Sequence, residues 1–129
     1  MSLFTGTKAL RHQFEKLLTA DLAGANDAAT AKLWIVFGNW GRLAYIDNTL
    51  RDNNDNGTEV QLLVQHPDAP VGDTTYRLPW IEVPGNRVIN YSVGNAPGIA
   101  FDPGTRIYVY KLAGSIEPTH GALRIATWG

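Results

Sequence analysis

The sequence predicts a mainly β protein, a single antiparallel β-sandwich with one N-terminal α-helix. From Lys32 onward, about seven short runs rich in β-branched and aromatic residues alternate with turn signals, which is typical of half-buried strands. The 13 glycines and seven prolines supply the tight turns that so many strands require. No helical pattern lies between these runs to form the long crossovers that parallel strands need, so antiparallel pairing is favoured.

One helix is expected before the sandwich, over residues 7–23. Five apolar residues recur at i, i+4, i+7, i+8 and i+12 and would share one helical face: Leu10, Phe14, Leu17, Leu18 and Leu22. Thr7 is a suitable N-cap, and Gly24 supplies a stop because glycine readily adopts the left-handed conformation. Residues 1–6 are expected to form a flexible arm, so residues 1–129 make one domain with the sandwich at 32–129.

Seven strands are expected in the sandwich. They are Lys32–Phe37, Arg42–Leu50, Thr58–His66, Thr74–Val83, Arg87–Val93, Thr105–Leu112 and Ala122–Trp128. The last two alternate regularly between two faces, with period 2. Pro79 cannot donate a backbone hydrogen bond, so its strand is expected at a sheet edge or at a bulge.

Composition narrows the function classes. The net charge is −1, with basic and acidic residues interspersed, so no basic footprint for nucleic acid is present and no nucleic-acid partner is expected. The longest apolar run, Leu33–Phe37, is far short of the roughly 20 residues that span a bilayer, so no membrane partner is expected. The absence of cysteine removes disulfides, thiolate metal ligands and cysteine nucleophiles together.

The segment Asp52–Gly57 is the best candidate for a metal site. Asp52, Asn54 and Asn56 fall at positions 1, 3 and 5 of an EF-hand-like loop, with Gly57 at position 6, where oxygen atoms would converge on Ca²⁺. The twelfth position is Leu63 rather than a bidentate Glu, so the match covers only the first half of the loop. The alternative interpretation is a solvated hairpin turn ending in Asn-Gly, and no cofactor is expected.

Catalytic signatures are missing from the sequence. The three histidines, His12, His66 and His120, form no close ligand pair of the kind that zinc sites use. The chain contains no nucleophile elbow, no phosphate-binding P-loop and no dinucleotide-binding glycine motif. We therefore expect a protein that is not an enzyme and has no catalytic residues.

The aromatic residues allow two interpretations. Four tryptophans are present, Trp34, Trp40, Trp80 and Trp128, together with five tyrosines. Most of these rings would pack in the core and across strands. Trp40, in a Gly-x-x-Gly turn, and Trp80, after the proline of an expected edge strand, are the candidates for an exposed binding face.

The segment Val88–Gly94 and the closing hairpin Ile107–Gly129 resemble, in their organisation, the small structural proteins of tailed bacteriophages. These include capsid cement or decoration proteins, with jelly-roll-like sandwiches, and small head–tail components. The resemblance implies a virion component, assembled in the host cytoplasm, that forms a homo-oligomer, contacts other virion proteins and lends an arm or edge strand to a neighbour. The apolar residues Leu10, Phe14, Leu17 and Leu18 are the interface candidates within that hypothesis.

A carbohydrate-binding β-sandwich module is the alternative function. Exposed Trp40 and Trp80 would then line a shallow face on which sugar rings stack. In this case carbohydrate, rather than another copy of the chain, would be the main partner.

Overall fold

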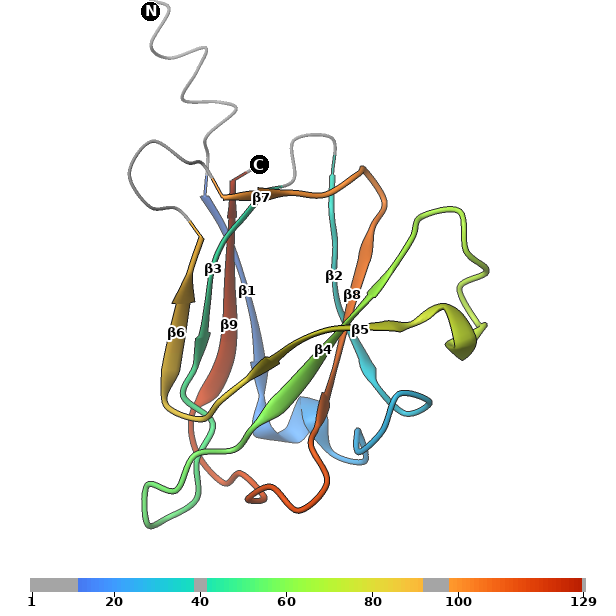
Figure 1. Cartoon of the computed structure of the whole chain (residues 1–129). Helices are drawn as coiled ribbons and strands as arrows, with labels where there is room; N and C mark the ends of the chain where they lie inside the picture. The colour runs from blue at the N-terminus through green and yellow to red at the C-terminus, as the bar shows by residue number, and fades with distance from the viewer. Residues whose placement is uncertain (1–11, 39–41, 92–97, 129) are drawn as a thin grey trace, which may run out of the picture.

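Figure 1 shows a computed structural model, which describes the backbone of residues 12–38, 42–91 and 98–128 and, within these ranges, the side chains from residue 17 to residue 127. The strands are β1 (His12–Leu18), β2 (Lys32–Val36), β3 (Arg42–Asn48), β4 (Val60–Gln65), β5 (Leu78–Val83), β6 (Arg87–Asn90), β7 (Ile99–Ala100), β8 (Arg106–Lys111) and β9 (Ala122–Trp128). Two short 3₁₀ helices, η1 (Thr19–Leu22) and η2 (Thr74–Tyr76), complete the described elements.

The strands form two antiparallel sheets, which confirms the prediction of a mainly β protein. One sheet has the order β1-β9-β3-β6, with β7 also paired to β3, and the other has the order β2-β8-β4-β5. Four antiparallel pairs are nested about the loop at 66–77: β4 with β5, β3 with β6, β2 with β8, and β1 with β9. The first half of the chain thus pairs with the second half in reverse order, and each half contributes to both sheets.

The core lies between the sheets. Its fully buried side chains come from the inward faces of both, and include Leu43, Ile46, Leu62, Ile107 and Ile125. Alternation along the strands accounts for this, because every second residue of a strand points to the same face. Trp34 is also buried in this cluster. Within the described residues, no helix has the length and apolar character needed to cross a membrane.

The predicted N-terminal helix is wrong. Residues 12–18 form β1 instead, and all seven pair with β9, from His12 opposite Trp128 to Leu18 opposite Ala122. Leu17 is buried while Leu18 is 48% exposed, so the two do not share one apolar face, as the predicted helix required; adjacent residues of a strand point to opposite faces. Sheet pairing prevails because β1 satisfies the backbone groups of β9 along its full length. Leu22, the last of the five apolar residues expected on the helical face, is fully buried in η1, the 3₁₀ helix that follows β1.

Strand β5 has the two properties that Pro79 predicts. It is at the edge of its sheet, and the register with β4 shifts between Leu62, opposite Ile81, and Leu63, opposite Pro79. Trp80 is therefore the extra residue of a β-bulge, a feature that reorients side chains at sheet edges.

The loop at 66–77 covers the outer face of the second sheet. Gln65 is fully buried there, and its Oε1 accepts hydrogen bonds from Tyr108 Oη and Arg106 Nη1, both at 2.9 Å. Its Nε2 donates to the carbonyl oxygens of Pro70 and Asp73 in the loop, so the buried amide has partners for both its oxygen and its nitrogen. The guanidinium of Arg77 lies 4.2 Å from the centroid of the Tyr108 ring, a cation–π contact that further holds the loop on the sheet.

Candidate functional site

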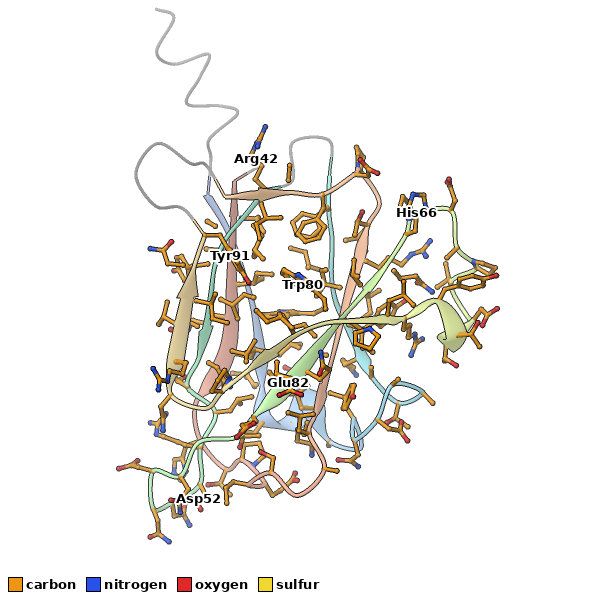
Figure 2. The ribbon with its side chains drawn as sticks, viewed as in Figure 1. Arg42, Asp52, His66, Trp80, Glu82 and Tyr91 are labelled. Carbon is orange, nitrogen blue, oxygen red and sulfur yellow. The ribbon has the colours of Figure 1, made fainter. Side chains whose placement is uncertain are left out.

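A series of aromatic rings in contact lies between the sheets, near the end of the sandwich where β7 crosses. Phe37 stacks on Phe101 with ring centroids 4.7 Å apart, and Trp80 meets Phe101 edge to face at 5.3 Å. Tyr91 in turn stacks on Trp80, with ring centroids 6.2 Å apart. Figure 2 shows Trp80 between the two sheets with Tyr91 beside it, so the bulge directs the tryptophan inward.

The burial of these aromatic rings is graded. Phe37 is buried, whereas Trp80, Tyr91 and Phe101 are half-buried and pack against the core from its margin. Burial raises the pKa of the Tyr91 hydroxyl above its ordinary value, because desolvation disfavours the phenolate. Trp80, predicted as part of an exposed binding face, is thus engaged with Tyr91 and Phe101 rather than presented as an open platform.

Beside these aromatic rings the surface is hollowed by a depression of about 350 Å³. Its apolar wall combines Val64 and Leu78, which are paired across β4 and β5, with Ala100 and Phe101 at the end of β7. Its polar groups are His66, Asp102 and Thr105. We call this the β7-end depression. Its lining residues come from both sheets, because β7 pairs with β3 of the first sheet whereas β4 and β5 belong to the second.

The polar side of the β7-end depression is held on two hydrogen-bonded turns. Thr105 donates its backbone N–H to the carbonyl oxygen of Asp102 at 3.0 Å, and Gly104 donates to the carbonyl oxygen of Phe37 at 2.7 Å. His66 Nδ1 accepts the backbone N–H of Asp68 at 3.1 Å. The turn residue Gly104 has a φ of +87°, a conformation that glycine tolerates, and a Cβ there would press on Pro67.

A second feature is the distribution of exposed apolar side chains. Among the described residues, eight large hydrophobic side chains are exposed, and five of them lie on the four strands that end the sheets: Leu18, Leu33, Val36, Leu78 and Val88. We call these five the apolar edge residues. Their exposed fractions run from 43% at Leu33 to 61% at Val88, so each leaves much of its apolar surface in water.

The predicted interface residues are divided by the structure. Leu17 faces the core, and Leu18 is exposed beside it on β1. Phe14 lies in β1 opposite Ala126, where only its backbone is described. Leu10 lies outside the described residues, as does Trp40, the other predicted binding-face residue.

The candidate calcium loop is closed on itself. Asp52 Oδ1 accepts the backbone N–H groups of Asn54 at 2.8 Å and Asn56 at 3.0 Å, and Asp52 Oδ2 accepts the side-chain amide of Asn56 at 3.0 Å. The hydrogen bonds from Asn56 are the main reason why the pKa of Asp52 is lowered. Asp55 has a φ of +62°, which suits a tight turn. Both oxygens of the carboxylate thus already serve the turn, at the end of the sandwich opposite Trp80 (Figure 2).

The histidines do not converge in the part of the chain that the structure describes. His66 lines the β7-end depression, whereas His120 Nδ1 lies 2.7 Å from the hydroxyl of Thr119, which in turn bonds Asn53. His12 contributes backbone to β1. In these ranges no three or more His, Asp or Glu side chains gather as they would around a metal ion.

Comparison with known proteins adds no relative: no family model, curated protein or solved structure matches this chain.

Sequence reasoning missed the principal residues of both features. Phe101 and Asp102 lie between the predicted strands Arg87–Val93 and Thr105–Leu112, and their shared position with Leu78 depends on the pairing of distant strands. The apolar edge residues Leu33, Val36 and Val88 fall in predicted strands, but which strands end the sheets is not visible in a strand pattern. An available signal was the neighbouring Phe101-Asp102-Pro103-Gly104, an aromatic and an acid directly before a turn.

Proposed function

We propose that the chain is a non-enzymatic assembly protein, a virion component that self-associates through the edges of its sheets and stabilises a larger particle. The observation that carries this proposal is the placement of the apolar edge residues on β1, β2, β5 and β6. Natural sheets usually blunt their edge strands with charge or other devices, because an unpaired edge is a template for association. An edge bearing exposed Leu and Val is instead suited to contact with another chain.

The order of the strands supports the same proposal. Leaving aside the two-residue β7, eight strands form two sheets of four whose nested pairs match the double Greek key of a jelly roll. Jelly rolls build viral capsid domains, although they also occur in lectins and cupins. This support is an analogy of fold, so the edges rather than the topology carry the proposal.

Two of the edges are available on opposite sheets. Val36 and Leu33 lie on β2, which ends the second sheet, and Val88 lies on β6, which ends the first. If edge β2 of one copy met edge β6 of the next, the contact would be heterologous and would generate a ring when its rotation closes. Such a ring could sit on a symmetric position of a particle and contact other virion proteins.

The test is the molar mass of the protein in solution, measured by light scattering coupled to size-exclusion chromatography. We expect a stable oligomer. Val36→Lys and Val88→Lys should each lower the mass towards that of the monomer, because a lysine placed on an edge disfavours pairing. Circular dichroism would verify that both variants keep the β spectrum.

Val71→Lys is the matched control, since Val71 is an equally exposed valine in the loop at 66–77 and does not lie on an edge strand. It should leave the mass unchanged. A wild-type protein that is monomeric at every concentration tested would refute the proposal. So would an oligomer that is insensitive to both edge substitutions.

The carbohydrate-binding alternative is favoured by one observation, the β7-end depression, and not by the tryptophans that first suggested it. Trp80 is occupied by its aromatic neighbours. Sugar binding by this chain would therefore use Phe101 and Leu78 in the depression.

A further inference from the structure

We propose that the β7-end depression is a binding site for an uncharged, hydroxylated ring of monosaccharide size. The site is distinct from the surface used in the assembly proposal, because Leu78 is the one residue shared by the lining of the depression and the apolar edge residues. Its volume of about 350 Å³ is within the range of small-molecule sites. It is formed where β7, which belongs to the first sheet, approaches β4 and β5 of the second.

The apolar wall offers a surface for one face of such a ring. Leu78 is 57% exposed although it is paired with Val64 on the inner side of β5, so its side chain remains open to a ligand. Phe101 is fixed from behind by its stacking on Phe37 and by the edge contact of Trp80. A ring bearing C–H groups on one face would cover this surface and gain from its removal from water.

The polar groups offer complementary hydrogen bonds to hydroxyl groups. The carboxylate of Asp102 only accepts hydrogen bonds, and the hydroxyl of Thr105 both donates and accepts. Because His66 Nδ1 accepts the backbone N–H of Asp68, the neutral imidazole carries its proton on Nε2 and can donate there. Hydroxyl groups both donate and accept, so a polyol ring suits this combination of donors and acceptors, in which Asp102 and His66 are exposed and Thr105 is buried.

The same groups select against other ligand classes. The lining residues include an acid and no lysine or arginine, so an anionic ligand would meet Asp102 without a compensating charge. A purely apolar ligand would bury Asp102 and His66 without hydrogen bonds, which costs free energy. A cationic side chain from a partner protein remains the main competing occupant, since Asp102 would pair with it.

The backbone that frames the site is held by main-chain hydrogen bonds, which limits the backbone entropy lost on binding. The turn that carries Asp102 is closed by the Thr105 N–H and is joined to Phe37 by Gly104 on one side and by the bond from Phe37 N–H to the Thr105 carbonyl, 2.9 Å, on the other. Ala69 N–H likewise binds the His66 carbonyl oxygen at 3.0 Å. Preorganisation of this kind favours binding by reducing the ordering cost.

The experiment is a titration of the ¹⁵N-labelled full-length protein with four probes, followed by ¹H–¹⁵N NMR. The probes are methyl α-D-glucopyranoside, methyl β-D-galactopyranoside, methyl α-D-mannopyranoside and N-acetyl-D-glucosamine. At least one should give saturable shifts confined to the backbone amides of Leu78, Phe101 and Asp102, their neighbours, and the indole of Trp80. Nα-acetyl-lysine amide, which keeps its Nζ ammonium charge, serves as the cationic comparison and should give no shifts at these positions.

Two pairs of variants test the residues. Asp102→Asn should raise the dissociation constant of the sugar about tenfold, because a carboxylate that accepts two hydroxyl donors is lost. Glu82→Gln, which removes the charge of an exposed acid on β5 that does not line the depression, should leave it unchanged. Leu78→Ala should weaken binding about threefold through lost apolar contact, whereas Val88→Ala on β6 should not.

Three results would overturn the proposal. One is the absence of saturable shifts with all four sugars, or shifts centred away from the β7-end depression. Another is equal weakening by Asp102→Asn and Glu82→Gln. The last is selective binding of Nα-acetyl-lysine amide at the depression, which would assign it to a basic side chain of a partner protein.

Discussion

Gly57 and Gly85 lie with their backbones in direct contact, at the end of the sandwich opposite β7. A Cβ added to Gly57 would fall 2.6 Å from the Cα of Gly85, and a Cβ on Gly85 would collide with the Cα of Gly57 in the same way. The contact joins the turn before β4 to the turn between β5 and β6. Asn86 adds to it by donating its side-chain amide to the carbonyl oxygen of Asp55 at 3.2 Å.

Gly85→Ala is therefore expected to destabilise the fold. The new methyl group would meet backbone, which cannot rotate away, so the two turns must separate, at a cost of about 1–3 kcal/mol. The measurement is the free energy of unfolding from urea denaturation. Gly72→Ala is the control, because nothing lies within 4 Å of the position of its added Cβ. Equal stability of both variants would contradict the close approach of the turns.

The side chain of Asn48 also connects these two turns, through hydrogen bonds to their main chains. It is fully buried, and its Nδ2 lies 2.8 Å from the carbonyl oxygen of Thr58, 3.3 Å from that of Val83 and 3.2 Å from that of Pro84. Its Oδ1 accepts the backbone N–H of Leu50 at 3.1 Å. One amide thus satisfies main-chain groups from the segment after β3, from the approach to β4, and from the end of β5 and the turn that follows it.

Asn48→Ala should lower the free energy of unfolding by about 2–4 kcal/mol, because it removes these bonds and leaves buried main-chain groups without partners. Urea denaturation would measure the loss. Asn54→Ala is the matched control: its side chain is exposed in the turn at 52–57, and its removal should change stability by less than about 0.5 kcal/mol. A cost at Asn48 no larger than at Asn54 would show that the hydrogen bonds of the Asn48 side chain contribute little to stability.

The strand content could be predicted from the sequence where local patterns and burial agree. Each of the seven predicted strands contains an observed one, because β-branched and aromatic residues alternate there and turn residues separate them. Pro79 even indicated an edge strand with a bulge. Residues 12–18 were mistaken for a helix because Phe14, Leu17 and Leu18 fit a helical spacing equally well. Only the partner strand β9, more than a hundred residues away, resolves that ambiguity.

The candidate sites were beyond sequence reasoning for a related reason. Phe101 and Leu78 become neighbours only after β4–β5 pairing and the path of β7 are fixed. Trp80 carried a strong compositional signal, but the bulge that turns it inward depends on its register with β4. Residue type therefore indicated that aromatic contacts mattered, whereas long-range pairing decided which rings stayed accessible.

Calcium is expected to leave the stability of the protein unchanged. Binding at the loop that contains Asp52 would compete with the hydrogen bonds from Asn54 and Asn56, which both carboxylate oxygens already accept. Thermal denaturation with millimolar CaCl₂ and with EDTA should give the same Tm. Addition of MgCl₂ controls for general ionic effects. A rise in Tm with calcium alone, abolished in Asp52→Ala, would instead establish the loop as a calcium site.

Acid should destabilise the protein through carboxylates that accept hydrogen bonds in the native state. Asp73 has a lowered pKa, chiefly because the hydroxyl of Thr75 donates to it at 2.6 Å and the backbone N–H of Thr75 donates at 3.0 Å. Asp27 has a lowered pKa for the same reason, with Thr30 as the donor at 2.7 Å. Since the native state binds fewer protons, this stabilisation is fully present above the ordinary value of 3.8 and is lost as pH falls through the lowered native values.

The two sites provide controls for each other in one experiment. Thr75→Ala removes the hydroxyl donor to Asp73, so the pKa of Asp73 should rise towards 3.8 while that of Asp27 stays where it was. Thr30→Ala should do the reverse. The side-chain carboxyl ¹³C shifts, followed by NMR from pH 2 to 6, report each aspartate separately. Movement of both pKa values in either variant would point to a global change in the acid-exposed protein and against the local hydrogen bonds as the cause.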